Sequence, residues 1–331
     1  MDKCNIIDNR KTFTRLSFSN HKKSKVIEEL ISCIYYKKRD DALHWTAEMI
    51  CSLYILDLWK IYIIFYCKYI HIHNIKIAIY VLKKLEEFKM INQSIKNDSD
   101  IKNNDDIRNI FFTLTIIFCE TKNENTLSTI PFVFSLEHMY DNLKANNVEY
   151  IKQFFKDGDP KEFYIPLNEF VYHMDKTKDQ TTIFYWIDWL IEYDIYLTKK
   201  KKPLFIQYRN LVDFKDEKKN KNIVWILWDI IIHYSKPHSD LIKKTVLSLF
   251  QLFQIKYKVT NNKTYKSLLY VSINLLLSNV NTNIKLIDNT SLFKNLYNNT
   301  QIIFEEIKKK EVWIEEVKTE KQKLYDSVYK I

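Results

Sequence analysis

The chain has 331 residues and a formal net charge of +10, and 46% of its residues are hydrophobic and 15% aromatic. A chain of this length and apolar content can bury a sizeable core, so intrinsic disorder is not expected over most of it. Its single glycine, Gly158, excludes phosphate-cradling loops, dinucleotide-binding turns and nucleophile elbows, which all depend on glycine. Tight β-turns are disfavoured for the same reason. We therefore expect an all-α fold of antiparallel helical hairpins, packed as one elongated bundle or two fused bundles.

The cysteines and the N-terminal segment indicate in which cellular compartment the protein is expected. The five cysteines include no CxxC pair and are odd in number, which is typical of a reduced intracellular protein. Residues 1–22 are charged and contain no apolar stretch, so they predict a polar N-terminal arm rather than a secretory signal. The apolar runs farther along are shorter than the roughly 20 residues that cross a bilayer, so no membrane partner is expected.

A 3.6-residue spacing of apolar residues begins at residue 25 and continues, with short interruptions, to residue 91. Asp40 is placed to cap the second helix of this stretch. The pattern predicts a compact, collar-like helical unit over residues 23–92, with helices at residues 25–36, 40–50, 56–70 and 75–91. The polar stretch QSIKNDSDIKNNDD, residues 93–106, predicts a surface loop or linker.

A helical domain is expected over residues 107–290. It is organised around a helix at residues 179–198, which carries Trp186 and Trp189 and runs into four lysines. The turn Asp157-Gly158-Asp159-Pro160 is the strongest turn signal in the chain, and Pro166 fits the first turn of the helix that follows it. The other helices expected here span residues 106–120, 135–144, 148–155, 166–174, 222–234, 239–257 and 264–278.

Two helices of this domain share a pair of tryptophans three residues apart, Trp186 with Trp189 and Trp225 with Trp228. Together with Trp45 in the preceding unit, this spacing favours repeated helical hairpins. Amphipathic helices in register also resemble one another without any repeat, so both interpretations stay open.

The C-terminal segment, residues 291–331, is expected to form an amphipathic helix. Its apolar residues follow alternating steps of four and three, as in a coiled-coil seam with two charged interruptions. One interpretation is that the segment docks on its own body, and the other is that it pairs with a partner helix or a second copy. The partner-helix candidates are Ile303, Ile307, Ile314, Val317, Leu324 and Val328.

Candidate catalytic and metal-binding residues are few. His71 and His73 lie two positions apart, which points them to different sides of a helix, and no further ligand stands at a recognised spacing, so no metal is expected. The carboxylates inside apolar helices have no matched nucleophile or second acid, and we interpret them as surface-facing or paired with Lys or Arg; they are Glu48, Glu169, Asp188, Glu192 and Asp229. We expect no enzyme, no cofactor and no small-molecule substrate.

The densest basic region of the chain follows the helix at residues 179–198. Lysines there could contact phosphates while the interleaved Phe205 and Tyr208 stack on bases. A solvated lysine loop and a nuclear-localisation-like signal in KKKKP are the alternatives. The nucleic-acid-binding candidates are Lys199, Lys200, Lys201, Lys202, Arg209, Lys218, Lys219 and Lys221.

The stretches DALHWTAEM and DLWKIYIIFYCKYIHIHNIKIAIYVL, within residues 25–90, resemble the helical segment after the ATPase module in clamp-loader-related AAA+ proteins of the replication-associated recombination and Werner-interacting type. The matching residues are Ala42, Leu43, Trp45, Ala47, Ile70 and Asn74. Lys68, Tyr69, His71 and Ile75 stand where that family has an acidic pair, a glycine and a proline. No ATPase module occurs in the sequence, so the resemblance implies an oligomerising helical collar linked to DNA replication or repair, without ATP-driven activity.

Three later segments, DPKEFYIPLNEFVYH, FYWIDWLIEYD and NIVWILWDIII, look like parts of a family of uncharacterised proteins encoded by giant nucleocytoplasmic DNA viruses. With the first resemblance, this likeness spans most of residues 25–235 and rests on shared Trp and Asp-Pro positions. It implies a viral origin and a helical fold, but no activity.

These observations lead to two functional hypotheses. The first is a non-enzymatic helical scaffold or accessory protein, collar-like, that acts with viral DNA replication or nucleic acid. The alternative is a structural or assembly protein of a large DNA virus particle or factory. Both place the protein inside the host cell, in a cytoplasmic factory or the nucleus, and the second also places it in the virion.

Overall fold

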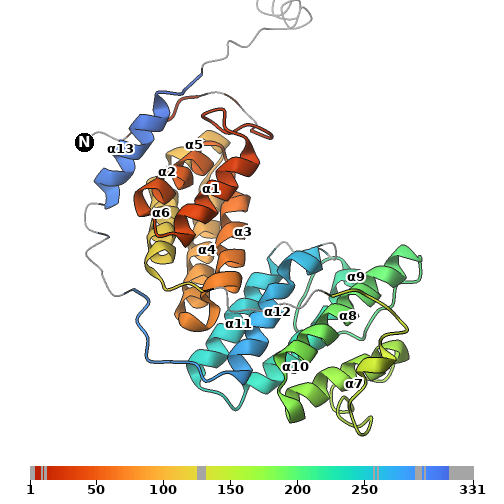
Figure 1. Cartoon of the computed structure of the whole chain (residues 1–331). Coiled ribbons are helices and arrows are strands. Elements are labelled where there is room, and N and C mark those ends of the chain that lie inside the picture. The colour runs from red at the N-terminus through yellow and green to blue at the C-terminus, as the bar shows by residue number, and fades with distance from the viewer. Residues whose placement is uncertain are drawn as a thin grey trace, which may run out of the picture. The chain divides into compact units, whose positions relative to one another are not determined.

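The computed structural model describes residues 4–8, 10, 13–124, 132–255, 258, 261–287, 293 and 296–312. Within these ranges the fold is all-α, as the scarcity of glycine predicts, and the one β-type pairing is an isolated bridge between Leu16 and Lys22 (Figure 1). None of the described helices combines the length and hydropathy needed to cross a membrane.

The chain divides into two compact units, which we treat one at a time. Unit 1 comprises Met1–Trp59, Glu87–Glu120 and Asn289–Ile331, and unit 2 comprises Lys60–Glu86 and Thr121–Asp288. The division falls within α3 (Ile55–Phe65) and α4 (Lys76–Ser94), so each unit contains part of both helices. The five cysteines are buried and free, four of them in unit 1 and Cys67 in unit 2.

Unit 1 is built around α2, which packs against α1, α6 and α13. A hydrogen bond of 2.8 Å between the hydroxyl groups of Thr46 and Thr115 joins α2 to α6 inside the core, and both hydroxyls also bond the carbonyl four residues earlier in their own helix. The core also contains aromatic side chains, with Trp59 packed against Phe88 and Phe111, and buried charged residues such as Arg108 and Glu48. The helices that belong wholly to this unit are α1 (Lys23–Tyr35), α2 (Arg39–Cys51), α5 (Asp98–Asn103), α6 (Asp105–Glu120) and α13 (Leu296–Lys308).

Two expectations for unit 1 differ from the structure. Helix α2 begins at Arg39 with Lys38 at its N-cap, so Asp40 lies in the first turn, where its charge still suits the helix dipole. The reason is that the turn ending α1 extends to Lys38, whose N–H bonds the Cys33 carbonyl at 2.9 Å, and α2 follows directly. Residues 93–106, expected as a loop or linker, contain α5 and lie within unit 1.

Helix α13 docks on the body of unit 1 along its described length. Its Phe304 is buried and stacks on Phe112, and the Cζ of the Arg108 guanidinium lies 3.7 Å from the centre of the Phe304 ring. Ile307 is buried and Ile303 is half-buried, so Ile307 is occupied by its own unit. The other partner-helix candidates, Ile314, Val317, Leu324 and Val328, lie outside the described residues.

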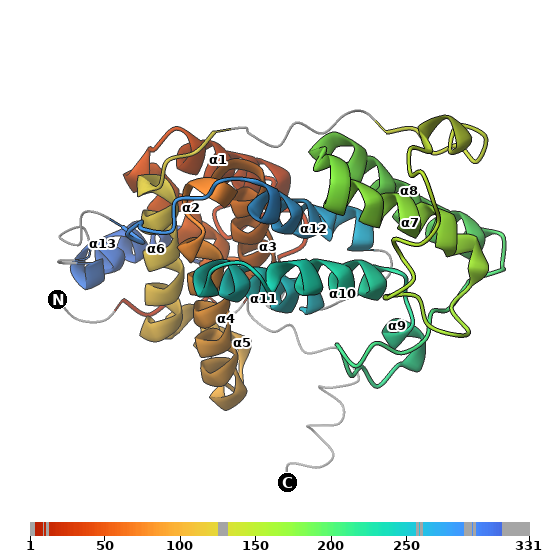
Figure 2. The same ribbon diagram turned by 90° about the horizontal axis from the view of Figure 1, so that it is seen from below.

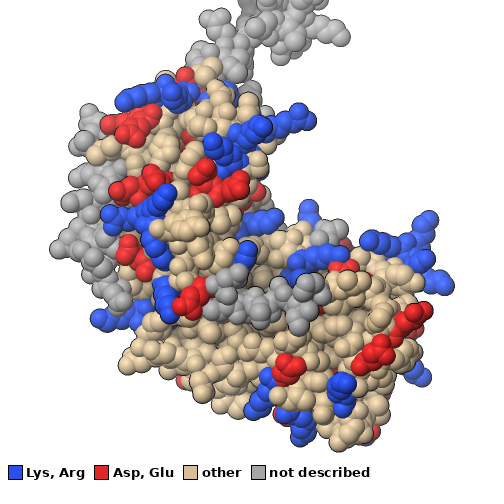
Figure 3. Space-filling model, in the orientation of Figure 1, with Lys and Arg blue, Asp and Glu red and all other residues tan. Residues whose placement is uncertain are grey.

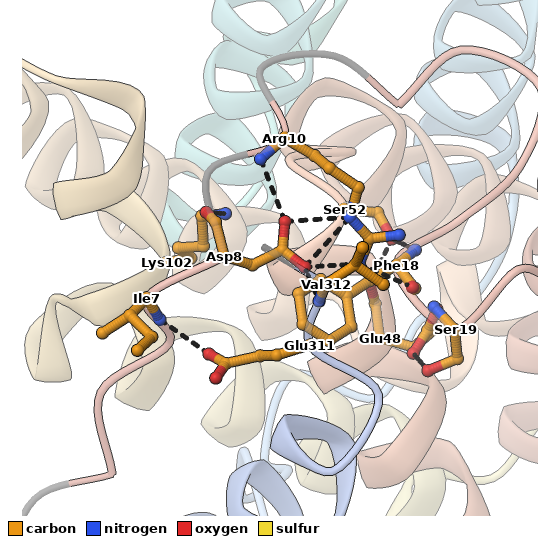
Figure 4. Close-up of polar contacts among 10 residues, drawn as sticks. All are labelled: Ile7, Asp8, Arg10, Phe18, Ser19, Glu48, Ser52, Lys102, Glu311 and Val312. Carbon is orange, nitrogen blue, oxygen red and sulfur yellow. Dashed lines mark hydrogen bonds and ion pairs between the residues drawn. The ribbon is translucent and has the colours of Figure 1, made fainter. Parts of the chain in front are cut away.

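The N-terminal arm packs on unit 1 through a buried carboxylate (Figure 4). Asp8 accepts hydrogen bonds from the backbone N–H of Arg10 at 3.0 Å, from the Arg10 Nη2 at 2.6 Å and from the backbone N–H of Val312 at 2.8 Å. Burial alone would raise the pKa of this carboxyl group, but the hydrogen bonds and the charge of Arg10 outweigh it and hold the pKa below its usual value. Asp8 therefore fastens the arm to the chain beyond α13.

A second carboxylate holds the end of the arm. Glu48, buried in α2, accepts from the backbone N–H of Ser19 at 2.8 Å and from its hydroxyl at 2.7 Å, and the Ser52 hydroxyl accepts from the N–H of Phe18 at 2.8 Å (Figure 4). The sequence pattern predicted that Glu48 is surface-facing or paired with Lys or Arg. The structure shows neither, since Glu48 is buried and its hydrogen-bond donors belong to Ser19. Its carboxylate is instead satisfied by the backbone N–H and the hydroxyl group of Ser19, whose N–H has no helical partner of its own.

Unit 2 is a second helical body in which α12 packs against α8, α10 and α11 (Figure 2). Trp186, Trp189, Trp225 and Trp228 are all buried, as the apolar faces of their helices predict. The helices that belong wholly to this unit are α7 (Tyr164–Tyr172), α8 (Gln180–Lys199), α9 (Glu217–Asn220), α10 (Val224–Ser235), α11 (Asp240–Gln254) and α12 (Asn262–Leu277).

A polar contact between α8 and α12 accompanies this packing. The buried Asp188 lies 2.6 Å from the Nζ of Lys266 and accepts a hydrogen bond from the Tyr270 hydroxyl, and burial raises the pKa of that hydroxyl. The Tyr270 ring stacks on Phe184 with centroids 4.2 Å apart. Asp188 is therefore a carboxylate paired with Lys, as expected.

The α-helices expected at residues 135–144 and 148–155 are not formed. The first contains only the 3₁₀ turn Tyr140–Asn142, and the second contains turns. Several backbone N–H groups there form local turn bonds, and at the boundary between the two segments Glu169 of α7 accepts from Lys144 at 2.9 Å and from Ala145 at 3.0 Å. A tertiary contact to a buried carboxylate thus fixes the chain where no helix forms.

Replacing Asp8 with Asn should loosen the N-terminal arm, because Arg10 and the Val312 N–H lose a charged acceptor inside unit 1. Breaking a buried pair costs about 3 kcal/mol, so we expect a lower free energy of unfolding in urea and faster proteolysis within residues 10–20. The control is Asp40→Asn, whose carboxylate is exposed and whose loss should change stability by less than about 0.5 kcal/mol. Equal stability of the two variants would contradict the anchoring role of Asp8.

Candidate nucleic-acid interface

The candidate site begins at the only glycine of the chain. Gly158 has a φ of +89°, and a Cβ placed there would lie 2.7 Å from the Nε2 of Gln207. A side chain would therefore be strained by the backbone conformation and would also press on the neighbouring loop. This glycine lets the turn bring its next residue, Asp159, under residues 206–209.

Asp159 is the anchor of that loop. Its carboxylate is buried and accepts from the backbone N–H of Gln207 at 2.8 Å and of Lys156 at 2.7 Å, and it forms an ion pair with the Nη2 of Arg209. The Nη1 of Arg209 donates to the Phe154 carbonyl at 2.9 Å. Charge-assisted bonds of this kind are short and strong, so one carboxylate fixes the loop at two of its residues.

Arg209 is the candidate residue that the structure places differently from the sequence interpretation. Its guanidinium is 1% exposed and is held by Asp159, so it does not belong to the charged surface. The physical reason is that a buried carboxylate needs a cation and N–H donors to offset its lost hydration, and Arg supplies both.

We call residues 199–221 the basic loop. Its two ends are tied together, since the backbone N–H of Ile206 donates to the carbonyl of Lys221 at 2.9 Å. The side chain of Asn220 closes the second half by accepting from the N–H of Phe214 at 2.8 Å and donating to its carbonyl at 2.9 Å. Hydrogen bonds therefore tie the basic loop at Ile206, Phe214, Asn220 and Lys221, even though it contains only the short helix α9.

The remaining candidate lysines lie on the outside of this ordered loop. Lys199, Lys200, Lys201, Lys202 and Lys218 are exposed, and Lys219 and Lys221 are half-exposed. Among the described residues, no carboxylate lies within the 4.0 Å ion-pair distance of any of them. In Figure 3 a group of Lys and Arg side chains stands out from the edge of unit 2 at which α8 ends in Figure 1.

Four consecutive lysines lie at the end of α8, where the backbone conformation terminates the helix. Lys201 adopts a φ of +59°, and the N–H of Lys202 bonds to the carbonyl of Leu197 at 2.9 Å, which ends the helix in a left-handed cap. Positive charge at a helix C-terminus is favourable because it faces the negative end of the helix dipole. The repulsion among the lysines is offset in part by that dipole, but no side-chain carboxylate of the described residues neutralises them.

Below the basic loop lies a buried carboxylate with a shifted pKa. Asp194 in α8 accepts from the Nδ2 of Asn222 at 3.0 Å, and Asn222 in turn accepts from the Val224 N–H at 3.2 Å at the start of α10. Burial raises the pKa of Asp194 to about 6, and the hydrogen bond from Asn222 only partly offsets this. The charged form of Asp194 is therefore a source of instability at neutral pH.

The two histidines considered as metal ligands have other roles. His71 is buried in unit 2 and its Nδ1 lies 3.3 Å from the Nδ2 of Asn274; burial lowers its pKa to about 4. His73 lies 3.3 Å from the carboxylate of Glu124. Across the described residues, no group of three or more His, Cys, Asp or Glu side chains is arranged to hold a metal ion.

Sequence patterns identified the lysines of this site but missed Asp159. Asp157 and Asp159 flank the same glycine, and no feature of the sequence tells which carboxylate is buried. The sequence feature that could have pointed to Asp159 was the turn at residues 157–160, since a tight turn followed by a buried helix brings its residues against other loops. No protein-family model, curated protein or solved structure matches this chain.

Replacing Asp159 with Ala should release the basic loop, because Arg209 is left buried without its counter-ion. We expect the free energy of unfolding to fall by about 3 kcal/mol or more, and chymotrypsin to cleave faster after Phe205 and Tyr208. The matched control is Asp157→Ala, two residues away and exposed. If both variants resist cleavage like the wild type, Asp159 does not anchor the loop.

The Asp194 carboxyl group should make stability depend on pH. Because its folded pKa is raised from 3.8 to about 6, its favourable neutral form is present below pH 4 and is lost as the pH rises to about 6. Asp194→Asn removes this dependence, so the stability of the variant relative to the wild type should increase by up to about 3 kcal/mol between pH 4 and pH 8. Urea unfolding at the two pH values measures the difference, and a constant difference would show that Asp194 has an ordinary pKa.

Proposed function

We propose that this chain is a non-enzymatic binding protein that holds nucleic acid on the basic loop of unit 2. The observation that carries the proposal is the run Lys199, Lys200, Lys201 and Lys202, exposed and without a carboxylate partner among the described residues, on a loop fixed by Asp159. A surface that keeps adjacent like charges unpaired suits a partner that brings regularly spaced negative charges.

The phosphate backbone of nucleic acid is such a partner. Each lysine that contacts a phosphate releases condensed counterions, which gives affinity without sequence preference and makes that affinity fall with salt. The anchoring by Asp159 adds to this, because a loop that is already ordered loses little conformational entropy on binding. The basic loop also carries an excess of positive charge, since its carboxylates are restricted to Asp213, Asp216 and Glu217.

A replication-associated role is the specific form of this proposal. It is supported by the resemblance of residues 25–90 to the helical collar of clamp-loader-related proteins. In that role the chain would act as an accessory protein that brings nucleic acid to a larger assembly. The assembly role in a virus particle stays the alternative prediction.

The test is a DNA-binding titration of the wild type and of a variant with Lys199, Lys200, Lys201 and Lys202 changed to Gln, at several salt concentrations. Loss of four phosphate contacts should weaken binding at least tenfold at low salt and reduce the slope of log K against log salt by about 3. A second variant removes the same charge from four exposed lysines elsewhere, Lys25, Lys89, Lys236 and Lys244.

That control separates a site from general basicity. It should lose less than about threefold in affinity, because only long-range attraction is reduced. Equal losses in the two variants, or no salt-dependent binding by the wild type, would refute the proposal. The second of these outcomes would leave the assembly role as the better account.

A further inference from the structure

We infer that the basic loop binds single-stranded rather than duplex nucleic acid, with unpaired bases stacking on Phe205 and Tyr208. This inference rests on the proposed function and adds the class of ligand. Phe205 and Tyr208 are 40% and 39% exposed as whole residues, whereas their neighbours Ile206 and Arg209 are 1% and 6% exposed. The backbone thus turns two apolar rings outward at positions beside others that it buries.

Exposed aromatic side chains are common on protein surfaces, so exposure alone does not make a site. The second observation is that Tyr208 is held in place. The Tyr208 hydroxyl donates to the Val212 carbonyl at 2.7 Å, and the Tyr208 carbonyl accepts from the Nζ of Lys156 at 2.9 Å. Among the described residues, neither Phe205 nor Tyr208 makes a ring contact with another aromatic side chain. Both residues are thus partly exposed without an aromatic partner among the described residues, and Tyr208 is fixed through its hydroxyl group and its carbonyl.

The third observation is the position of the lysines around the rings. Lys202 precedes Phe205 by three residues, and the bond from the Ile206 N–H to the Lys221 carbonyl brings the other end of the loop beside it. Lysines from both ends of the basic loop thus flank the aromatic pair. A chain whose phosphates follow the lysines would pass its bases over Phe205 and Tyr208.

Bases in a duplex are stacked on each other and paired, so their faces cannot reach a protein side chain without unstacking. Unpaired bases expose their faces, and stacking of one base on an aromatic ring contributes about 1–3 kcal/mol without sequence preference. The same lysines would attract either form, so the rings decide between them. Single-stranded nucleic acid is the ligand that uses both features of the loop.

The decisive experiment uses three fluorescent probes of equal length: an oligo(dT), the same backbone with abasic sites in place of the bases, and a duplex. For the variant with Phe205→Leu and Tyr208→Leu, we expect affinity for oligo(dT) to fall at least tenfold, because two stacking contacts are lost. Affinity for the abasic strand and for the duplex should stay within about twofold of the wild type. Tyr208→Phe, which keeps the ring, should bind oligo(dT) within about threefold of the wild type.

The control for surface aromatics is Tyr140→Leu, where the residue is 70% exposed and is followed by Asp141 rather than by lysines. It should leave all three affinities unchanged, and thermal melting should show that every variant is folded. Unchanged oligo(dT) binding by the Phe205 and Tyr208 double variant, with binding still lost in the four-lysine variant, would overturn this inference and leave the proposed function standing. Failure of the wild type to bind any of the probes would overturn both.

Discussion

The arrangement of the basic loop depends on the carboxylate of Asp159. It is buried, and it is balanced by one guanidinium and two backbone N–H groups that come from both sides of the contact between the turn and the loop. An isolated buried carboxylate would be too costly to keep charged, so its presence requires all of these partners at once. That requirement sets the position of the loop backbone at Gln207 and Arg209, between which Tyr208 is exposed, whereas Lys199 to Lys202 are positioned by the end of α8.

Buried carboxylates that accept hydrogen bonds from loop N–H groups also occur elsewhere in the chain. Asp8, Glu48 and Glu169 are buried carboxylates that accept hydrogen bonds from loop N–H groups far from them in sequence. In each case the N–H groups belong to a segment without regular helix, where they have no partner in their own backbone. Glycine, which most readily adopts the conformations of tight turns, occurs once in the chain, and in these segments buried side-chain carboxylates satisfy N–H groups of the loops.

These contacts between buried carboxylates and distant loops also explain which features of the fold could be predicted from the sequence and which could not. Helical periodicity identified the tryptophan-bearing helices and their buried faces, and Asp179 caps α8 by accepting from the Thr181 N–H at 3.2 Å. These features depend on residues within a few positions of each other. The roles of Glu48 and Glu169 depend on distant loops, so a pattern within one helix assigned them to the surface or to cation pairs. The absence of an α-helix at residues 143–155 was missed for the same reason, since the N–H groups of Lys144 and Ile151 bond to side chains of α7.

The burial of the five cysteines has a chemical consequence. Burial raises the pKa of Cys67 and of Cys119 to about 12 and also raises the pKa values of Cys4, Cys33 and Cys51. The thiolate is the species that attacks disulfides and alkylating reagents, so almost none of it is present in the folded chain at neutral pH. These thiols stay free because they are neutral and out of reach, whatever the redox potential of the surroundings. Their reactivity is therefore governed by how often each unit opens, with Cys67 reporting on unit 2 and the other four on unit 1.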